Sequence, residues 1–146
     1  MRKFALMLVA GAVGALSLTA FSLASTKTTT WTAALTSGQE IPKQVVKVTA
    51  AHGQFKGTLS GSKLTWKLTF AKLSGPTTGA HIHMGAMGKA GNVLVVLCAA
   101  ACKSGVTGTA TITAAEKAAF KKHLLYVNVH TAKNPNGEIR GQLAAG

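Results

Sequence analysis

The chain has 146 residues, a length typical of one domain, and carries 16 Lys and Arg against 3 acidic residues, a formal charge of +13. The acidic residues are Glu40, Glu116 and Glu138, and the sequence contains no Asp. This composition excludes an aspartic dyad, a Ser-His-Asp triad, an Asp-rich calcium loop and a two-metal carboxylate cluster.

The first segment has the features of a secretory signal peptide. Arg2 and Lys3 precede an apolar run over residues 4–24. Ala24 and Ser22 are small residues at positions −1 and −3 relative to a cut after Ala24, which suits cleavage there. We therefore predict a signal peptide at 1–24. An uncleaved anchor is the alternative, because the run is about long enough to span a bilayer.

The rest of the chain is expected to form one exported domain. Residues 25–30 are polar and predict a flexible leader, and residues 31–146 form the domain. No segment after the signal is long and apolar enough to cross a bilayer, so we expect no stable membrane insertion after cleavage. The localisation that follows is secreted, periplasmic or cell-envelope.

Hydrophobic alternation predicts β-strands through most of this domain. Leu64, Trp66, Leu68 and Phe70 alternate with Lys and Thr, as in a strand with one buried face. Weaker strand candidates are 31–36, 45–50, 53–59, 79–84, 92–98, 106–112, 125–131 and 138–143. Because Gly, Pro, Asn and Ser separate them, the pattern predicts an all-β fold, an antiparallel Greek-key-like sandwich of about eight strands.

Two features between these strands have a local physical signature. Thr113 and Glu116 fit a capping box, so residues 114–122 predict a short helix. Cys98 and Cys102 are the only cysteines, and an even pair in an exported protein predicts a disulfide. A metal-binding or redox pair is the alternative. A disulfide requires the chain to turn between the two residues, because an extended path would hold their Cα atoms about 13 Å apart.

The histidine pair His81 and His83 is the most informative feature. Residues two apart in a strand point to the same side of the sheet, so both imidazoles lie opposite Ile82. Imidazoles are favoured ligands of copper and zinc, and two on one strand make part of a metal site. Surface histidines without a ligand are the alternative.

A third histidine follows the same rule in a later segment. In residues 126–130, His130 lies opposite Val127 and Val129, whose apolar side chains predict the core face. If the two strands meet, this third imidazole completes the site. Metal binding should then weaken as the pH falls through the ordinary His pKa near 6.5, because protonated imidazole cannot bind a metal.

Four short motifs stand in order along the chain. They are Leu35-Thr36-Ser37-Gly38-Gln39-Glu40-Ile41-Pro42, Ala80-His81-Ile82-His83-x-Gly85, Tyr126-Val127-Asn128-Val129-His130-Thr131 and Asn134-Pro135-x-Gly137-Glu138-Ile139-Arg140-Gly141-Gln142-Leu143. Together they resemble the chordin-type (CHRD) domain over about residues 31–143. The resemblance implies a bacterial exported protein, whereas the family's biochemical role is poorly defined.

A second, weaker resemblance concerns the ligands. His81-Ile82-His83 is similar to the His-Val-His copper-ligand strand of copper/zinc superoxide dismutases, and Val129-His130, with Arg140 after a turn, is similar to a later part of that site. The resemblance implies copper ligands at His81, His83 and His130 and a Greek-key sandwich. Because this sequence has no Asp, the zinc site of that family cannot be reproduced here.

The sequence is compatible with three functions. The first is a binding module with a mononuclear His-rich site for copper, with zinc as second choice; Met84 and Met87 beside the pair suit Cu(I). The second is a metal-free adhesion or scaffold module whose basic surface binds anionic cell-envelope polymers or acidic proteins. The third is a copper-dependent redox enzyme, for which the sequence shows no substrate site.

Two further expectations concern the charged residues. Nucleic acid is not an expected partner, because the lysines are spread singly and Arg140 is the one Arg after the signal. Glu138 and Arg140 share strand parity and are expected to form an exposed ion pair. The alternative is that Glu40 and Glu138 support the ligating imidazoles.

Overall fold

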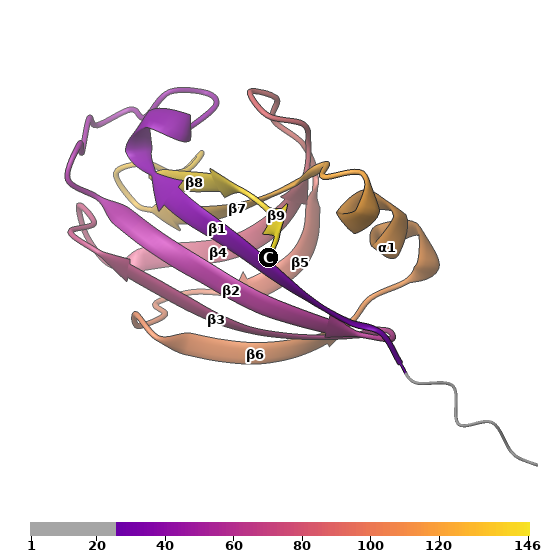
Figure 1. Cartoon of the computed structure of the whole chain (residues 1–146). Helices are drawn as coiled ribbons and strands as arrows, with labels where there is room; N and C mark the ends of the chain where they lie inside the picture. Colours follow the sequence, from indigo (N-terminus) through magenta and orange to yellow (C-terminus); the bar gives the residue numbers. More distant parts are fainter. Residues whose placement is uncertain (1–25) are drawn as a thin grey trace, which may run out of the picture.

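Residues 26–146 form a curled antiparallel sheet with one helix in the computed structural model of the protein (Figure 1). The expected signal peptide at 1–24 lies outside these described residues. Within them, no helix is long and apolar enough to cross a membrane.

The elements, in chain order, are β1 (Thr28–Thr36), η1 (Ser37–Gln39), β2 (His52–Ser60), β3 (Lys63–Ala71), β4 (Thr77–Met84), β5 (Val93–Cys98), β6 (Val106–Thr111), α1 (Ala114–Lys121), β7 (Leu125–Thr131), β8 (Ile139–Gln142) and β9 (Ala144–Ala145). Hydrogen bonds join the strands in the order β5-β4-β7-β8-β1-β2-β3-β6, and β9 pairs with β1. The predicted all-β antiparallel class with one short helix is confirmed.

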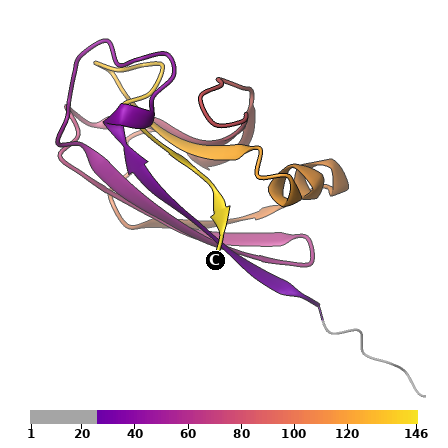
Figure 2. The ribbon, with the colours of Figure 1, turned by 45° about the horizontal axis from the view of Figure 1, so that its top comes forward.

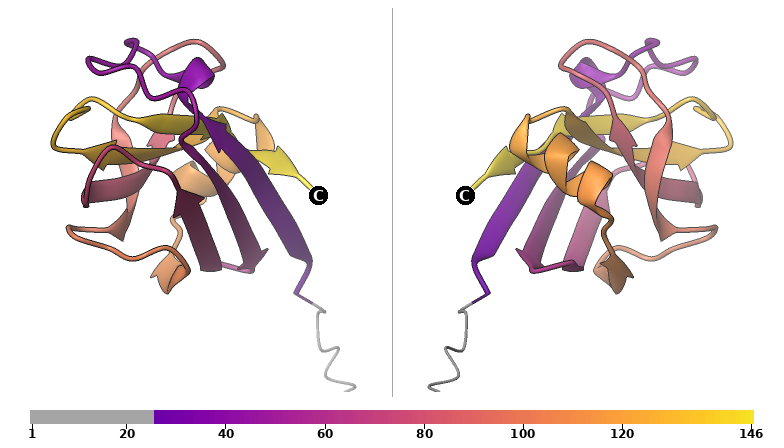
Figure 3. Two further views of the ribbon diagram at one scale, coloured as in Figure 1. Left: turned by 90° about the vertical axis from the view of Figure 1, so that its left-hand side faces the viewer. Right: turned by 90° about the vertical axis from the view of Figure 1, so that its right-hand side faces the viewer.

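The sheet folds over on itself, so that its two halves face each other across the core (Figures 2 and 3). The alternation in β3 places Leu64 and Leu68 inside, where both are fully buried. From the other half, Ile82 of β4 and Val127 of β7 join the same core cluster. α1 covers one end of this core, where Phe120 packs edge-on against Trp31 of β1 with ring centroids 5.2 Å apart.

Most strand ends differ from the prediction by one or two residues, and two regions differ more. Residues 45–50 are not a strand, and Val45 and Val46 are exposed. The backbone of Val46 forms its hydrogen bonds with the Asn134 side chain and not with a neighbouring strand. Asn134 Oδ1 accepts from the Val46 amide at 2.8 Å, and Asn134 Nδ2 donates to the Val46 carbonyl at 3.0 Å. In addition, β1 begins at Thr28, so residues 28–30 of the expected leader are paired with β2.

The helix and the cysteine pair follow local chemistry, as expected. The Thr113 hydroxyl accepts from the Glu116 amide, and the Glu116 carboxylate accepts from the Thr113 amide, which completes the capping box. Cys98 and Cys102 form a disulfide with their Cα atoms 6.1 Å apart. The chain turns between them, with Ala101 at a φ of 47°.

Candidate metal centre

The imidazoles of His81, His83 and His130 converge on the side of the sheet that faces away from the core. β4 and β7 are antiparallel neighbours, and their register places His81 opposite Asn128 and Gly79 opposite His130. Ile82 and Val127 are paired on the core side, as strand parity predicts.

The three rings are close enough to share one ion. His81 Nδ1 and His130 Nε2 are 3.1 Å apart. One ligand nitrogen from each of the three residues lies within 4.8 Å of the others. The ring centroids of His81 and His83 are 5.5 Å apart, and those of His83 and His130 are 5.9 Å apart. This His cluster could hold a metal ion.

Backbone carbonyls set which ring nitrogen can bind. His83 Nδ1 lies 3.0 Å from the Gly91 carbonyl, and His130 Nδ1 lies 2.9 Å from the Pro135 carbonyl. A carbonyl only accepts hydrogen bonds, so each Nδ1 carries the proton and each Nε2 carries the lone pair. Histidine ligands in metal sites are commonly held in this way.

The remaining nitrogens fit this arrangement. His83 Nε2 is buried and has no hydrogen-bond partner among the described residues. His81 Nδ1 donates to the lone pair of His130 Nε2, so an ion bound between them would need the His81 proton on Nε2 instead. The Cε1 of His81 lies close to Gly79. A Cβ added at Gly79 would lie 3.1 Å from that Cε1, so a larger residue would press on the ring.

Burial keeps the three imidazoles neutral at physiological pH. Burial lowers the pKa of His130 to about 4, and it also lowers the pKa values of His81 and His83. Electrostatic repulsion from His83 lowers the pKa of His81 further, and repulsion from Arg140 lowers that of His83. Neutral imidazoles bind a metal without first losing a proton. The expected weakening of binding near pH 6.5 therefore moves to lower pH.

Aromatic and cationic side chains extend the cluster along β7 and β8. The Tyr126 ring stacks on His83 at a centroid distance of 4.9 Å and an angle of 5°. The Arg140 guanidinium lies 3.5 Å from the Tyr126 ring centroid. Arg140 also donates to the carbonyls of Ala86 and Lys89 at 3.2 and 2.9 Å, which ties the β4–β5 loop to the sheet.

Glu40 is fully buried beside Asn128 of β7, and its carboxyl group has no hydrogen bond to any of the three imidazoles among the described residues. Asn128 Nδ2 donates to both of its carboxylate oxygens, at 2.8 and 2.9 Å. Burial raises the pKa of Glu40 to about 8, against the opposing effects of Asn128 and Arg140. The carboxyl group is therefore mostly protonated at neutral pH, and its contacts fix the loop after η1 onto β7.

The expected exposed pair of Glu138 and Arg140 is wrong. Both residues are buried, with 0% and 2% of their surface exposed. β8 begins at Ile139, so Glu138 belongs to the preceding turn and does not follow the strand's alternation. Its carboxylate accepts from the Ser74 amide at 2.6 Å, the Ser74 hydroxyl, the Thr131 hydroxyl at 2.5 Å and Asn134 Nδ2 at 3.1 Å.

These four hydrogen bonds determine the ionisation of Glu138. Burial raises its pKa, but the donors lower it by more and hold it below the ordinary value. The carboxylate joins the β3–β4 loop to the β7–β8 turn, so its role here is to connect these segments. Within residues 26–146, its carboxylate has no hydrogen bond to any of the three imidazoles.

Sequence reasoning found the three histidines and missed the layer around them. By the same alternation Tyr126 and Asn128 lie with His130 on the side of β7 opposite Val127 and Val129, yet they are 4% and 3% exposed. Loops from elsewhere in the chain cover them, and alternation carries no information about such loops. Met84 and Met87 are exposed, and His52 and His123 are not part of the cluster.

The fold and the site together define a class: an antiparallel β domain that holds three converging imidazoles on one side of its sheet. The family model of the CHRD domain matches residues 31–143, and the chain belongs to this family. No curated protein matches the chain, and no solved structure matches it.

Proposed function

We propose that this protein is an exported binding module that holds one copper ion through His81, His83 and His130. The proposal rests on the buried Nε2 of His83, which has no hydrogen-bond partner in the described part of the chain and lies beside the close pair of nitrogens from His81 and His130. A buried lone pair without a donor is costly, and a bound cation would satisfy it.

Copper is preferred to zinc for two reasons. A given set of nitrogen ligands binds Cu(II) more tightly than Zn(II). The resemblance of His81-Ile82-His83 to a copper-ligand strand points the same way. Three imidazoles leave at least one coordination position open, which suits a site that exchanges or delivers its metal.

Export is supported by features at two places in the chain. Residues 1–24 have a basic start, an apolar run and small residues at the cleavage position. Disulfides such as Cys98–Cys102 persist chiefly in oxidising compartments outside the cytosol.

Titration calorimetry with Cu(II), combined with electron paramagnetic resonance, tests the site. We expect one equivalent of copper to bind, with nitrogen couplings from imidazole ligands. His81→Ala, His83→Ala and His130→Ala should each lower the affinity about 10- to 100-fold or more, because each removes one of three ligands. A parallel titration with Zn(II) ranks the two metals.

His52→Ala and His123→Ala are the matched controls, since they remove imidazoles outside the cluster. Their copper affinity should equal that of the unaltered protein. Unchanged affinity in His130→Ala, or an equal loss in the controls, would contradict the proposed site.

A further inference from the structure

The half of the sheet made by β1, β2, β3 and β6 presents a second polar surface, on the side away from the core. Its register aligns side chains in rows across the four strands. The rows are Thr28, Ser60, Lys63 and Thr111; then Thr30, Thr58, Thr65 and Thr109; then Thr32, Lys56, Lys67 and Thr107. We name these twelve residues the threonine–lysine face.

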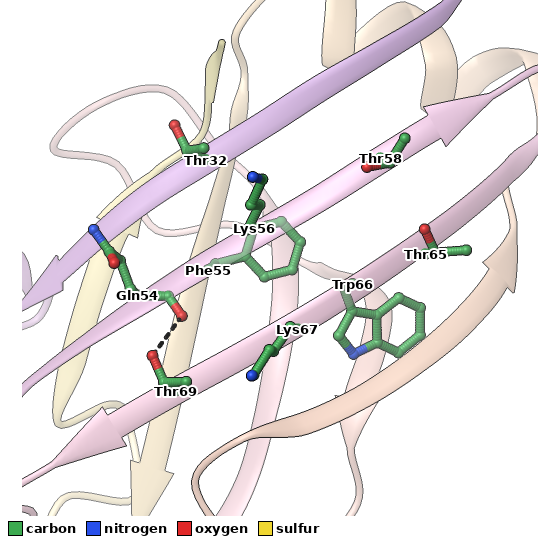
Figure 4. A pocket seen from close by; sticks show the side chains of 9 residues that line it. All are labelled: Thr32, Gln54, Phe55, Lys56, Thr58, Thr65, Trp66, Lys67 and Thr69. Atoms are coloured by element: carbon green, nitrogen blue, oxygen red, sulfur yellow. Dashed lines mark hydrogen bonds between the residues drawn. The ribbon is translucent and has the colours of Figure 1, made fainter.

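This face has a uniform chemistry of hydroxyl and ammonium groups. Strand spacing and rise give it dimensions of about 14 Å in each direction. Figure 4 shows Lys56 beside Lys67 and Thr58 beside Thr65 on the neighbouring strands β2 and β3, around a shallow hollow. The large side chains of the same strands, such as Phe55 and Trp66, are buried in the core.

Lys56 and Lys67 are directly opposite each other in the register. Like charges in that position destabilise a sheet unless an anion lies between them. The three acidic side chains of the sequence are engaged elsewhere: Glu40 and Glu138 are buried, and Glu116 caps α1. No side-chain carboxylate therefore neutralises this face within residues 26–146.

We propose that the threonine–lysine face binds an acidic polysaccharide. Lysine ammonium groups would pair with carboxylates of the glycan, and the rows of threonine hydroxyls would exchange hydrogen bonds with sugar hydroxyls. The regular array of rows suits an extended polymer. This inference does not depend on the metal site, which lies on the other half of the sheet.

The face fits other anionic partners less well. It has no aromatic ring on which a nucleic-acid base could stack, and no Arg to read a base edge. It has no exposed apolar side chain to enter a lipid bilayer. The paired hydroxyl and ammonium groups match a ligand that carries both hydroxyls and carboxylates.

Affinity electrophoresis in gels with polygalacturonate tests the proposal, with dextran and inorganic polyphosphate as comparison polymers. We expect retardation by polygalacturonate and none by dextran. Lys56→Gln with Lys67→Gln should weaken binding to polygalacturonate about tenfold or more at low salt, because two ammonium groups that pair with its carboxylates are lost. Lys121→Gln with Lys122→Gln, an exposed pair outside the face, removes the same charge and should change binding by less than about threefold.

A second variant separates glycan recognition from general attraction to polyanions. Thr58→Val with Thr65→Val keeps the charge and the strand preference but removes two hydroxyls. It should weaken binding to polygalacturonate about fivefold and leave binding to polyphosphate unchanged. Equal losses in the two lysine double variants would overturn the proposal, as would equal losses for both polymers in the threonine variant. Circular dichroism checks that each variant is folded.

Discussion

At the scale of single residues, burial makes Glu40 a group that titrates near neutral pH. The folded chain holds its proton up to a pH of about 8, whereas the unfolded chain releases it near 4.5. Between these values the unfolded state binds fewer protons, so stability falls as the pH rises. His130 acts in the opposite direction, because its pKa of about 4 in the folded state lies below the ordinary 6.5.

Glu40, together with the three histidines, predicts the pH of greatest stability, because burial also lowers the pKa values of His81 and His83. Below pH 6.5 the unfolded chain protonates its imidazoles while the folded chain keeps them neutral, so the three buried histidines together destabilise the fold as the pH falls and outweigh the opposing effect of Glu40. Above pH 6.5 the effect of Glu40 remains, and it destabilises the fold as the pH rises toward 8. We expect the metal-free protein to be most stable near pH 6.5 and to lose about 1 to 2 kcal/mol of unfolding free energy by pH 8. Urea unfolding in the presence of a chelator measures this loss.

Glu40→Gln is the control for that prediction. The neutral amide has the shape of the protonated carboxyl group and keeps an acceptor for Asn128 Nδ2. Its unfolding free energy should change little between the two pH values. If it loses as much stability as the unaltered protein, Glu40 is not the titrating group.

At the scale of elements, α1 illustrates how a short helix depends on both local capping and tertiary contact. Eight residues are too few for a stable helix in isolation. The capping box satisfies amides at the first turn, and Phe120 anchors the other end in the core, where it is 1% exposed.

Thr113→Ala removes one half of the capping box. We expect it to lower the unfolding free energy by about 1 kcal/mol, because an amide of the first turn loses its side-chain acceptor. Thr49→Ala, at an exposed loop position, should change it by less than about 0.5 kcal/mol. Equal stability of the two variants in urea unfolding would show that the cap contributes nothing.

At the scale of the whole molecule, the domain begins close to the proposed cleavage position. β1 starts at Thr28 and pairs with β2 along its full length. Cleavage after Ala24 would leave only three residues before that strand. The intact mass of exported protein should therefore correspond to a chain that begins at Ser25 with its disulfide formed, and retention of residues 1–24 would contradict this.

The side of each strand that a residue occupies was available from the sequence alone. Alternation placed His81 and His83 opposite Ile82, and His130 opposite Val127, because the side-chain period of a strand is two. The capping box likewise predicted α1, since its hydrogen bonds join residues three apart. Such short-range rules need no knowledge of which segments become neighbours.

Only the tertiary structure decided which strands become neighbours and which segments cover each face of the sheet. β7 lies beside β4 although a helix and two strands separate them in the chain, and this pairing brings His130 to His81. Glu40, in the loop after η1, is buried against Asn128 of β7, and the β4–β5 loop contacts Tyr126 and Arg140, so these contacts also join distant positions. Alternation distinguishes the two sides of a sheet, but burial depends on long-range contacts that leave no periodic signal in the sequence.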